Sequence, residues 1–214
     1  MTAILLATTN AKKIERIRNL LKAAGTGVEA KIPSDLGLES VEVEEGSDLL
    51  ENARAKARAY FGKTDLSILG MDSGFFIDNE ILDPAMVKRN ALAGADESGL
   101  SQEQIRDRMV AYYRAIAEKH GGQAEAYWKD VLVLIMPDGA ERSAEAIRPV
   151  ILTTETRGEV NEYFPLRSMY IPKATGKYVA DSTPEEANKE LAPISEALLE
   201  ITKNMEENKE LKSK

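Results

Sequence analysis

The chain has 214 residues, enough to bury a substantial core in one α/β domain or in two smaller ones. Its formal net charge is -8, which argues against the broad basic surface that a nucleic-acid polymer requires, although a few lysines and a divalent metal can still hold a small anion. The absence of cysteine excludes disulfides, thiolate zinc sites and cysteine nucleophiles, and the single histidine excludes histidine-rich metal centres.

The chain shows no sign of a targeting or membrane segment. The first residues lack the basic and apolar regions of a secretion signal, and no apolar run approaches the roughly 18 residues of a spanning helix. We therefore expect a cytoplasmic protein that does not associate with membranes.

The first predicted elements are a strand over residues 3–7 and a helix marked by the spacing of Ile14, Ile17 and Leu21. Between them lies the polar turn Thr8-Thr9-Asn10. This turn follows a strand and precedes a helix, where backbone N–H groups without helical partners bind anions well.

Residues 38–46 alternate between apolar and polar side chains, which predicts a half-exposed strand with an acidic outer face. Ser47 can cap a following helix with an apolar stripe over residues 49–60. Asn52 and Lys56 are four residues apart and therefore share another stripe of that helix.

A buried strand over residues 66–71 is expected to deliver Asp72 to its tip. Asp72-Ser73-Gly74 are ordinary turn residues, so we expect the backbone to turn there and residues 75–78 to form a return strand. A carboxylate at a strand tip, with Gly74 allowing a close approach of the backbone, looks like half of a metal–phosphate site. Lys13, Lys56 and Lys88 are candidates for the basic half, although lysines on helices are solvated by default.

The rest of the chain predicts alternating helices and strands. Residues 83–99 have the composition of a loop, and Ser101 with Gln104 forms a capping box for a helix that ends at Gly121-Gly122. Strands over 131–136 and 146–153 flank a turn, and Thr183-Pro184 begins a C-terminal helix that Pro193 restarts or kinks. Residues 206–214 are highly charged and are expected to fray.

Three motifs occur in order: Thr8-x-Asn10-x-x-Lys13, then Gly46-x-x-x-x-Glu51-Asn52-Ala53-x-x-Lys56-Ala57, then Asp72-Ser73-Gly74. In these motifs the chain resembles the inosine triphosphate pyrophosphatase (Ham1-like) family, which hydrolyses non-standard purine nucleoside triphosphates. The resemblance implies an α/β fold with a long twisted mixed sheet flanked by helices and two lobes around a central cleft. It also implies a single domain over residues 1–214, made of a core and a smaller lobe, and a homodimer.

The resemblance further implies water attack on a nucleoside triphosphate, with Mg²⁺, to release the monophosphate and pyrophosphate. Thr8, Asn10 and Lys13 would hold the phosphates, Lys56 would add a second positive charge, and Asp72 would bind the metal or orient the water. These roles suit phosphoryl transfer, in which catalysis comes mainly from positioning and from cations.

Other members of the expected site follow from the same resemblance. Ser73 and Gly74 would belong to the substrate-binding segment. Asp72 and Lys13 would be the catalytic residues. Magnesium prefers one or two carboxylates together with waters and phosphate oxygens, which favours Glu44 as the second ligand, with Glu42 and Glu45 as alternatives. Lys88 is a candidate phosphate contact, and Arg89 is a near-equal one.

The chain departs from the family at three places. Met71 stands where most members carry a second acid, residues 161–165 lack the glycines and aspartate of the base-contacting segment, and Leu191-Ala192-Pro193 replaces a serine-histidine-arginine motif that reads the purine. Tyr163 or Phe164 could still stack on a base. We therefore expect altered base specificity, and keep as alternatives a Maf-like pyrophosphatase and a non-catalytic nucleotide-binding or interaction protein.

Overall fold

The structure is a computed structural model that describes residues 2–44, 46–94, 96–203 and 205. The segment expected to fray, residues 206–214, lies outside the described residues. The strands are β1 Thr2–Leu6, β2 Val28–Lys31, β3 Ser67–Ile77, β4 Glu80–Ile81, β5 Gln123–Ile135, β6 Glu141–Thr153 and β7 Tyr170–Pro172. The α-helices are α1 Ala11–Ala23, α2 Leu49–Arg58, α3 Pro84–Leu92, α4 Gln102–Lys119 and α5 Pro184–Thr202.

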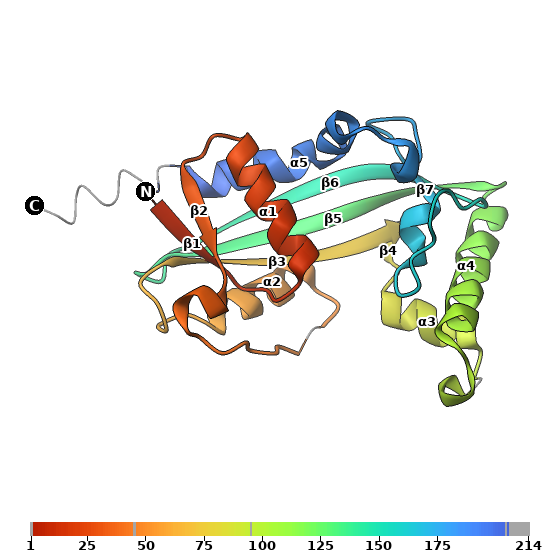
Figure 1. Cartoon of the computed structure of the whole chain (residues 1–214), viewed down its shortest axis with the longest axis horizontal. Helices are drawn as coiled ribbons and strands as arrows, with labels where there is room; N and C mark the ends of the chain where they lie inside the picture. The colour runs from red at the N-terminus through yellow and green to blue at the C-terminus, as the bar shows by residue number, and fades with distance from the viewer. Residues whose placement is uncertain (1, 45, 95, 204, 206–214) are drawn as a thin grey trace, which may run out of the picture. The chain divides into compact units, whose positions relative to one another are not determined.

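The strands form one mixed sheet in the order β2-β1-β3-β5-β6-β7, with β4 paired to β3 (Figure 1). β1 runs parallel to both β2 and β3, whereas β4 pairs with β3 and β7 with β6 in the antiparallel direction. This mixed sheet with its flanking helices confirms the predicted α/β class.

The chain divides into two compact units. The first comprises Met1–Ser73, Asp130–Ala146 and Pro193–Lys214, and the second comprises Gly74–Lys129 and Ile147–Ala192. Among the described residues, no helix combines the length and the apolar composition that a membrane crossing requires.

In the first unit, α1 and α2 cover opposite faces of the sheet because alternate residues of β3 contact them in turn. Gly70 packs against the backbone of α2, whereas Met71 lies against Arg16 of α1. β1 ends at Leu6, which pairs with Leu69, and the N–H of Ala7 donates the next bond to the Leu69 carbonyl. β3 continues beyond this point, so that Asp72 comes three residues after Leu69, past the end of its parallel neighbour.

The second unit has its own apolar core, centred on Phe75, Met109, Tyr113 and Met169. The capping box of α4 is confirmed, since the Ser101 and Gln104 side chains each accept a bond from the other residue's N–H. Burial raises the pKa of Tyr170 to about 12, with a smaller contribution from the charge of Glu190.

Two predictions in the first half of the chain were wrong. No strand forms over the described part of residues 38–46, because a period-two pattern becomes a strand only where it pairs with a neighbour, and the described part of this segment joins no strand of the sheet. The backbone does not turn at Asp72-Ser73-Gly74 either: β3 runs through to Ile77 and the turn comes at Asp78 and Asn79, with φ of 53° and 65°. The return strand is the short β4.

The expectation of a loop over residues 83–99 was also wrong, since this range contains α3. The Asp83 side chain caps the helix by accepting a 2.8 Å bond from the Met86 N–H, and the fixed φ of Pro84 suits the first helical position. At the C-terminus, α5 is one continuous helix with Pro193 inside it.

Candidate active site

Asp72 is held by two residues of α2 in the first unit. Its Oδ1 lies 2.7 Å from Lys56 Nζ, and its Oδ2 accepts a 2.9 Å hydrogen bond from Asn52 Nδ2. The Asp72 side chain is only 8% exposed, and that of Lys56 is 15% exposed. Because a buried carboxylate is stable only when it is paired and hydrogen-bonded, these contacts hold Asp72 in place.

Gly70 explains why α2 comes so close to β3. A Cβ at this position would lie 2.0 Å from the carbonyl oxygen of Ala53 and 3.0 Å from the N of Ala57, so only glycine permits the contact. Gly70 and Asp72 point to the same face of the strand, since they are two residues apart. The close packing therefore brings Asn52 and Lys56 to Asp72.

Asn52 also holds the loop that precedes α2. Its Oδ1 accepts a 2.8 Å bond from the Gly46 N–H, and its Nδ2 donates a 2.9 Å bond to the Gly46 carbonyl. The second sequence motif is thus a physical unit, in which Gly46, Asn52 and Asp72 share one set of hydrogen bonds. Sequence reasoning found the motif but gave Asn52 no role.

The first motif forms the start of α1. Asn10 is the N-cap and accepts a 3.1 Å bond from the Lys13 N–H, and the Thr8 hydroxyl accepts a 3.2 Å bond from the Asn10 N–H. The prediction that this turn lies between a strand and a helix amino end is confirmed. Such a helix start, with its N–H groups and positive dipole end, favours a bound anion.

The pKa of Lys13 is lowered by burial and, next, by the positive charge of Lys56. Arg16 lowers the pKa further, whereas the carboxylates of Asp72 and Asp130 raise it. Lys13 is therefore close enough to interact electrostatically with two carboxylates, Asp72 and Asp130. A cation in such a position is suited to binding a phosphate group.

On the opposite face of β3, Ser73 contacts a second buried acid that sequence reasoning missed. Asp130 of β5 has no exposed surface, and its Oδ1 accepts a 2.6 Å hydrogen bond from Ser73 Oγ. Arg16 Nη2 lies 3.8 Å from the same oxygen and 3.9 Å from Met71 Sδ. A charged residue directly before the apolar run over residues 131–136 was the signal available in the sequence.

The structure brings together most of the expected site, but not all of it. Glu44 and its alternative Glu42 are exposed, while Glu45 lies outside the described residues. Gly74 is buried in β3, directly after Ser73. Lys88 belongs to α3 of the second unit, where it forms an ion pair with Glu97, and Arg89 is exposed.

The residues present fit a magnesium ion that is shared with a substrate. Within the described ranges, no three acidic or histidine side chains converge into a metal cage. Magnesium does not need one, since it binds through one or two carboxylates, waters and phosphate oxygens. Asp72 accepts one hydrogen bond from Lys56 and one from Asn52 and retains acceptor capacity on both oxygens.

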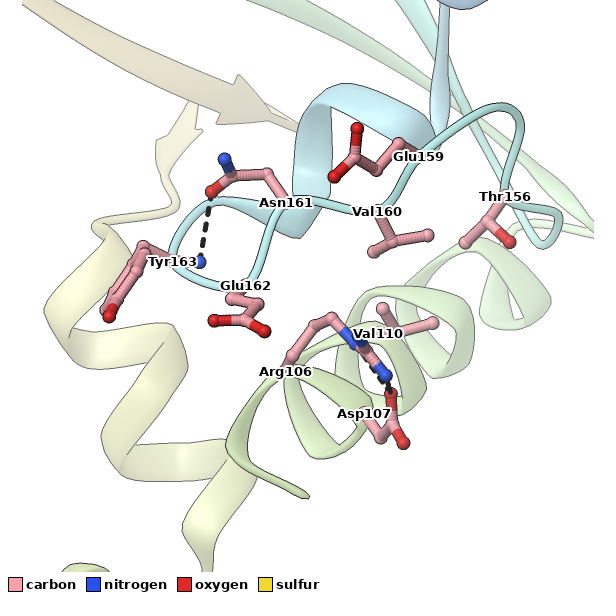
Figure 2. A pocket seen from close by; sticks show the side chains of 9 residues that line it. All are labelled: Arg106, Asp107, Val110, Thr156, Glu159, Val160, Asn161, Glu162 and Tyr163. Atoms are coloured by element: carbon pink, nitrogen blue, oxygen red, sulfur yellow. Dashed lines mark hydrogen bonds and ion pairs between the residues drawn. The ribbon is translucent and has the colours of Figure 1, made fainter. Parts of the chain in front are cut away.

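A separate pocket lies in the second unit, between α4 and residues 156–163 (Figure 2), and has a volume of about 550 Å³. Its charged groups include the carboxylates of Asp107, Glu159 and Glu162, and its one guanidinium, Arg106, is turned to Asp107 at 2.8 Å. Tyr163 lies at this pocket and is 74% exposed. A lining dominated by carboxylates does not suit a triphosphate, so the candidate active site is the cluster of the first unit.

Comparison with known proteins gives matches over most of the chain. A model described as the Ham1 family matches residues 4–211. The dITP/XTP pyrophosphatase of Yersinia pestis is 33% identical over 195 residues, which cover 87% of this chain and 89% of that protein. A protein of the same name from Streptomyces avermitilis is 29% identical over 212 residues and covers 93% of this chain and 100% of its own length.

Solved structures show the same fold. A HAM1 protein from Coxiella burnetii matches with a TM-score of 0.65 at 20% identity, covering 94% of this chain and 100% of that one. A nucleoside-triphosphatase / dITP/XTP pyrophosphatase from Mycobacterium abscessus matches with a TM-score of 0.61 at 22% identity, covering 92% and 97% of the two chains.

Proposed function

Because the chain belongs to the Ham1 family, we propose that it is a nucleoside triphosphate pyrophosphohydrolase that removes non-standard nucleotides. The observation that carries the proposal is the contact of Asp72 with Lys56 and Asn52, within the electrostatic reach of Lys13 at the start of α1. Since relatives are named dITP/XTP pyrophosphatases, dITP and XTP are the proposed first substrates.

In the proposed reaction, water cleaves the anhydride between the α- and β-phosphates and leaves a nucleoside monophosphate and pyrophosphate. Thr8, Asn10 and the first turn of α1 bind phosphate oxygens, while Lys13 and Lys56 offset their negative charge. Asp72 orients the attacking water, because its carboxylate is held in place on both oxygens. Ser73, Gly74 and Lys88 remain proposed members of the substrate-binding surface.

We propose Mg²⁺ as the metal, held by Asp72 and Glu44 together with the substrate. When bound, this ion would offset negative charge on the triphosphate. Asp72 supplies a buried and oriented carboxylate for it, whereas Glu44 supplies an exposed one from the segment before α2. We also propose that the protein is cytoplasmic and that it forms a homodimer. Light scattering of the purified chain would test the dimer.

The direct test is a panel of nucleoside triphosphates, including dITP, XTP and the standard ones, incubated with Mg²⁺ and assayed for pyrophosphate. We expect release from at least one non-standard nucleotide and a loss of kcat of at least about a hundredfold in Asp72→Asn. The matched control is Asp35→Asn, which removes an exposed carboxylate that is paired with Arg18 on α1.

Two results would contradict the proposal in different ways. Full turnover by Asp72→Asn would reject the role of that carboxylate while leaving the enzyme intact. No turnover of any nucleotide, with nucleotide binding preserved, would instead identify a non-catalytic nucleotide-binding protein.

A further inference from the structure

Asp130 is a fully buried carboxylate in the first unit that the proposed reaction does not use. It has no exposed surface, so it cannot itself touch a nucleotide. Its partners include the Ser73 hydroxyl, at 2.6 Å, and the Arg16 guanidinium, at 3.8 Å. A buried charge persists where partners compensate it, so this arrangement is a built polar network.

Ser73 and Arg16 each lie close in the chain to a residue of the proposed site. Ser73 directly follows Asp72 on β3, and Arg16 lies three positions after Lys13 on α1, which places both on one side of the helix. Asp130 comes from β5, a third element. A single carboxylate therefore joins the strand that carries Asp72 to the helix that carries Lys13.

The bond from Ser73 to Asp130 also decides what the hydroxyl can do. Serine has one donor proton, and here it is donated to Asp130. Phosphate oxygens need donors, whereas the remaining lone pairs of Ser73 can only accept a bond, from a water or an ammonium group. Ser73 therefore takes part as an acceptor beside Asp72.

We propose that Asp130 is a positioning residue: through Ser73 and Arg16 it fixes β3 and α1 so that Asp72 and Lys13 face the same triphosphate. The inference rests on the proposed pyrophosphohydrolase function. It assigns to Arg16 the task of holding α1 against the strands, with Asp130 as its countercharge.

The test uses the full chain with Asp130→Asn, which keeps the shape of the side chain and removes its charge. We expect kcat for pyrophosphate release to fall about tenfold or more, as for other outer partners of a site, while KM stays within about twofold. The double variant Arg16→Gln/Asp130→Asn should lose no more kcat than the more damaged of the two single variants, because both changes break the same link between α1 and β3. Asp35→Asn, which removes the exposed partner of Arg18 on α1, should match the wild type.

A kcat unchanged in Asp130→Asn would overturn the proposal, and so would a double variant whose loss of kcat equals the product of the two single losses, because independent contacts multiply. An increase in KM equal to the loss of kcat/KM would also overturn it, because it would indicate a lost substrate contact. If Asp130→Asn does not fold, Ser73→Ala and Arg16→Gln break the same contacts from partly exposed side chains. Unchanged kcat in both would then overturn the proposal.

A second readout does not depend on turnover and separates this inference from the proposed function. Hydrogen–deuterium exchange of Asp130→Asn should rise in segments 11–18 and 70–75 and remain unchanged in β2. A uniform increase in exchange across the first unit of Asp130→Asn, or no increase at all, would overturn the positioning role. This holds even if the protein hydrolyses no nucleotide. If the wild type releases no pyrophosphate while Asp130→Asn shows this local increase in exchange, only the proposed function is rejected.

Discussion

Lys56 and Asp72 form an ion pair, with Nζ 2.7 Å from Oδ1, across the contact between α2 and β3. The pair exists because Gly70 lets the backbone of α2 approach the strand, and because Asn52 takes the second oxygen of the carboxylate. Neither side chain could be moved without disturbing the packing of the helix.

Asn52→Leu should destabilise the fold as well as the site. The variant leaves Asp72 Oδ2 and both backbone groups of Gly46 without the bonds that Asn52 makes. We expect a loss of about 3 kcal/mol in the free energy of unfolding, measured by urea denaturation. The control Asn19→Leu, on the exposed side of α1, should change it by less than about 0.5 kcal/mol. A stable Asn52→Leu would show that this network contributes little.

Gly70→Ala should separate α2 from β3. The added Cβ would lie 2.0 Å from a backbone oxygen that no side-chain rotation can move away. We expect destabilisation of about 3 kcal/mol and a large loss of turnover, because Lys56 and Asn52 move with the helix. Gly99→Ala, where a Cβ meets nothing within 4 Å, is the matched control. Equal thermal midpoints for the two variants would be inconsistent with the close packing.

Lys13 should make nucleotide binding sensitive to alkaline pH. Its pKa lies below that of an ordinary lysine, chiefly through burial, so it loses its proton as pH rises while exposed lysines remain charged. We expect kcat/KM to decline on the alkaline side, and Lys13→Arg to flatten this decline because arginine stays charged. A pH profile that is identical in Lys13→Arg would remove Lys13 from the binding site.

The lowered pKa of Lys13 also predicts that the alkaline decline in kcat/KM does not come from unfolding. In the range between the folded pKa of Lys13 and its ordinary value of 10.5, the unfolded chain binds the proton that the folded chain has released. The contribution of Lys13 to stability therefore rises with pH across that range. Thermal midpoints measured beside the kinetic profile would separate the two effects.

Glu44→Gln should raise the magnesium concentration that half-saturates turnover by about tenfold, if Glu44 is the second metal ligand. Glu42→Gln is the natural control, since both side chains are exposed in the same segment. An equal effect of the two variants would indicate only general attraction of the cation by a negative surface.

Local patterns were sufficient to predict α1, α2, α4 and the strand that carries Asp72. Their signals are short-range: an N-cap, a capping box, or an apolar stripe at helical spacing. The strand predicted over residues 38–46 was wrong because a strand also needs a neighbour, which no local pattern reveals. The turn expected at Asp72 was wrong for a related reason, since pairing with neighbouring strands carries β3 through turn-forming residues.

The site divides in the same way. From sequence alone came the family resemblance, the helix start at Asn10, and Lys13, Lys56 and Asp72 as its charged members. Only the tertiary structure showed that Gly70 allows α2 to pack closely against β3 and that Asn52 joins Asp72 to Gly46. It also showed that Asp130 contacts Ser73 and Arg16. The physical reason is that residue type and spacing determine helices and caps within a few residues, whereas hydrogen bonds between Ser73 and Asp130, 57 positions apart, depend on which strands become neighbours in the sheet.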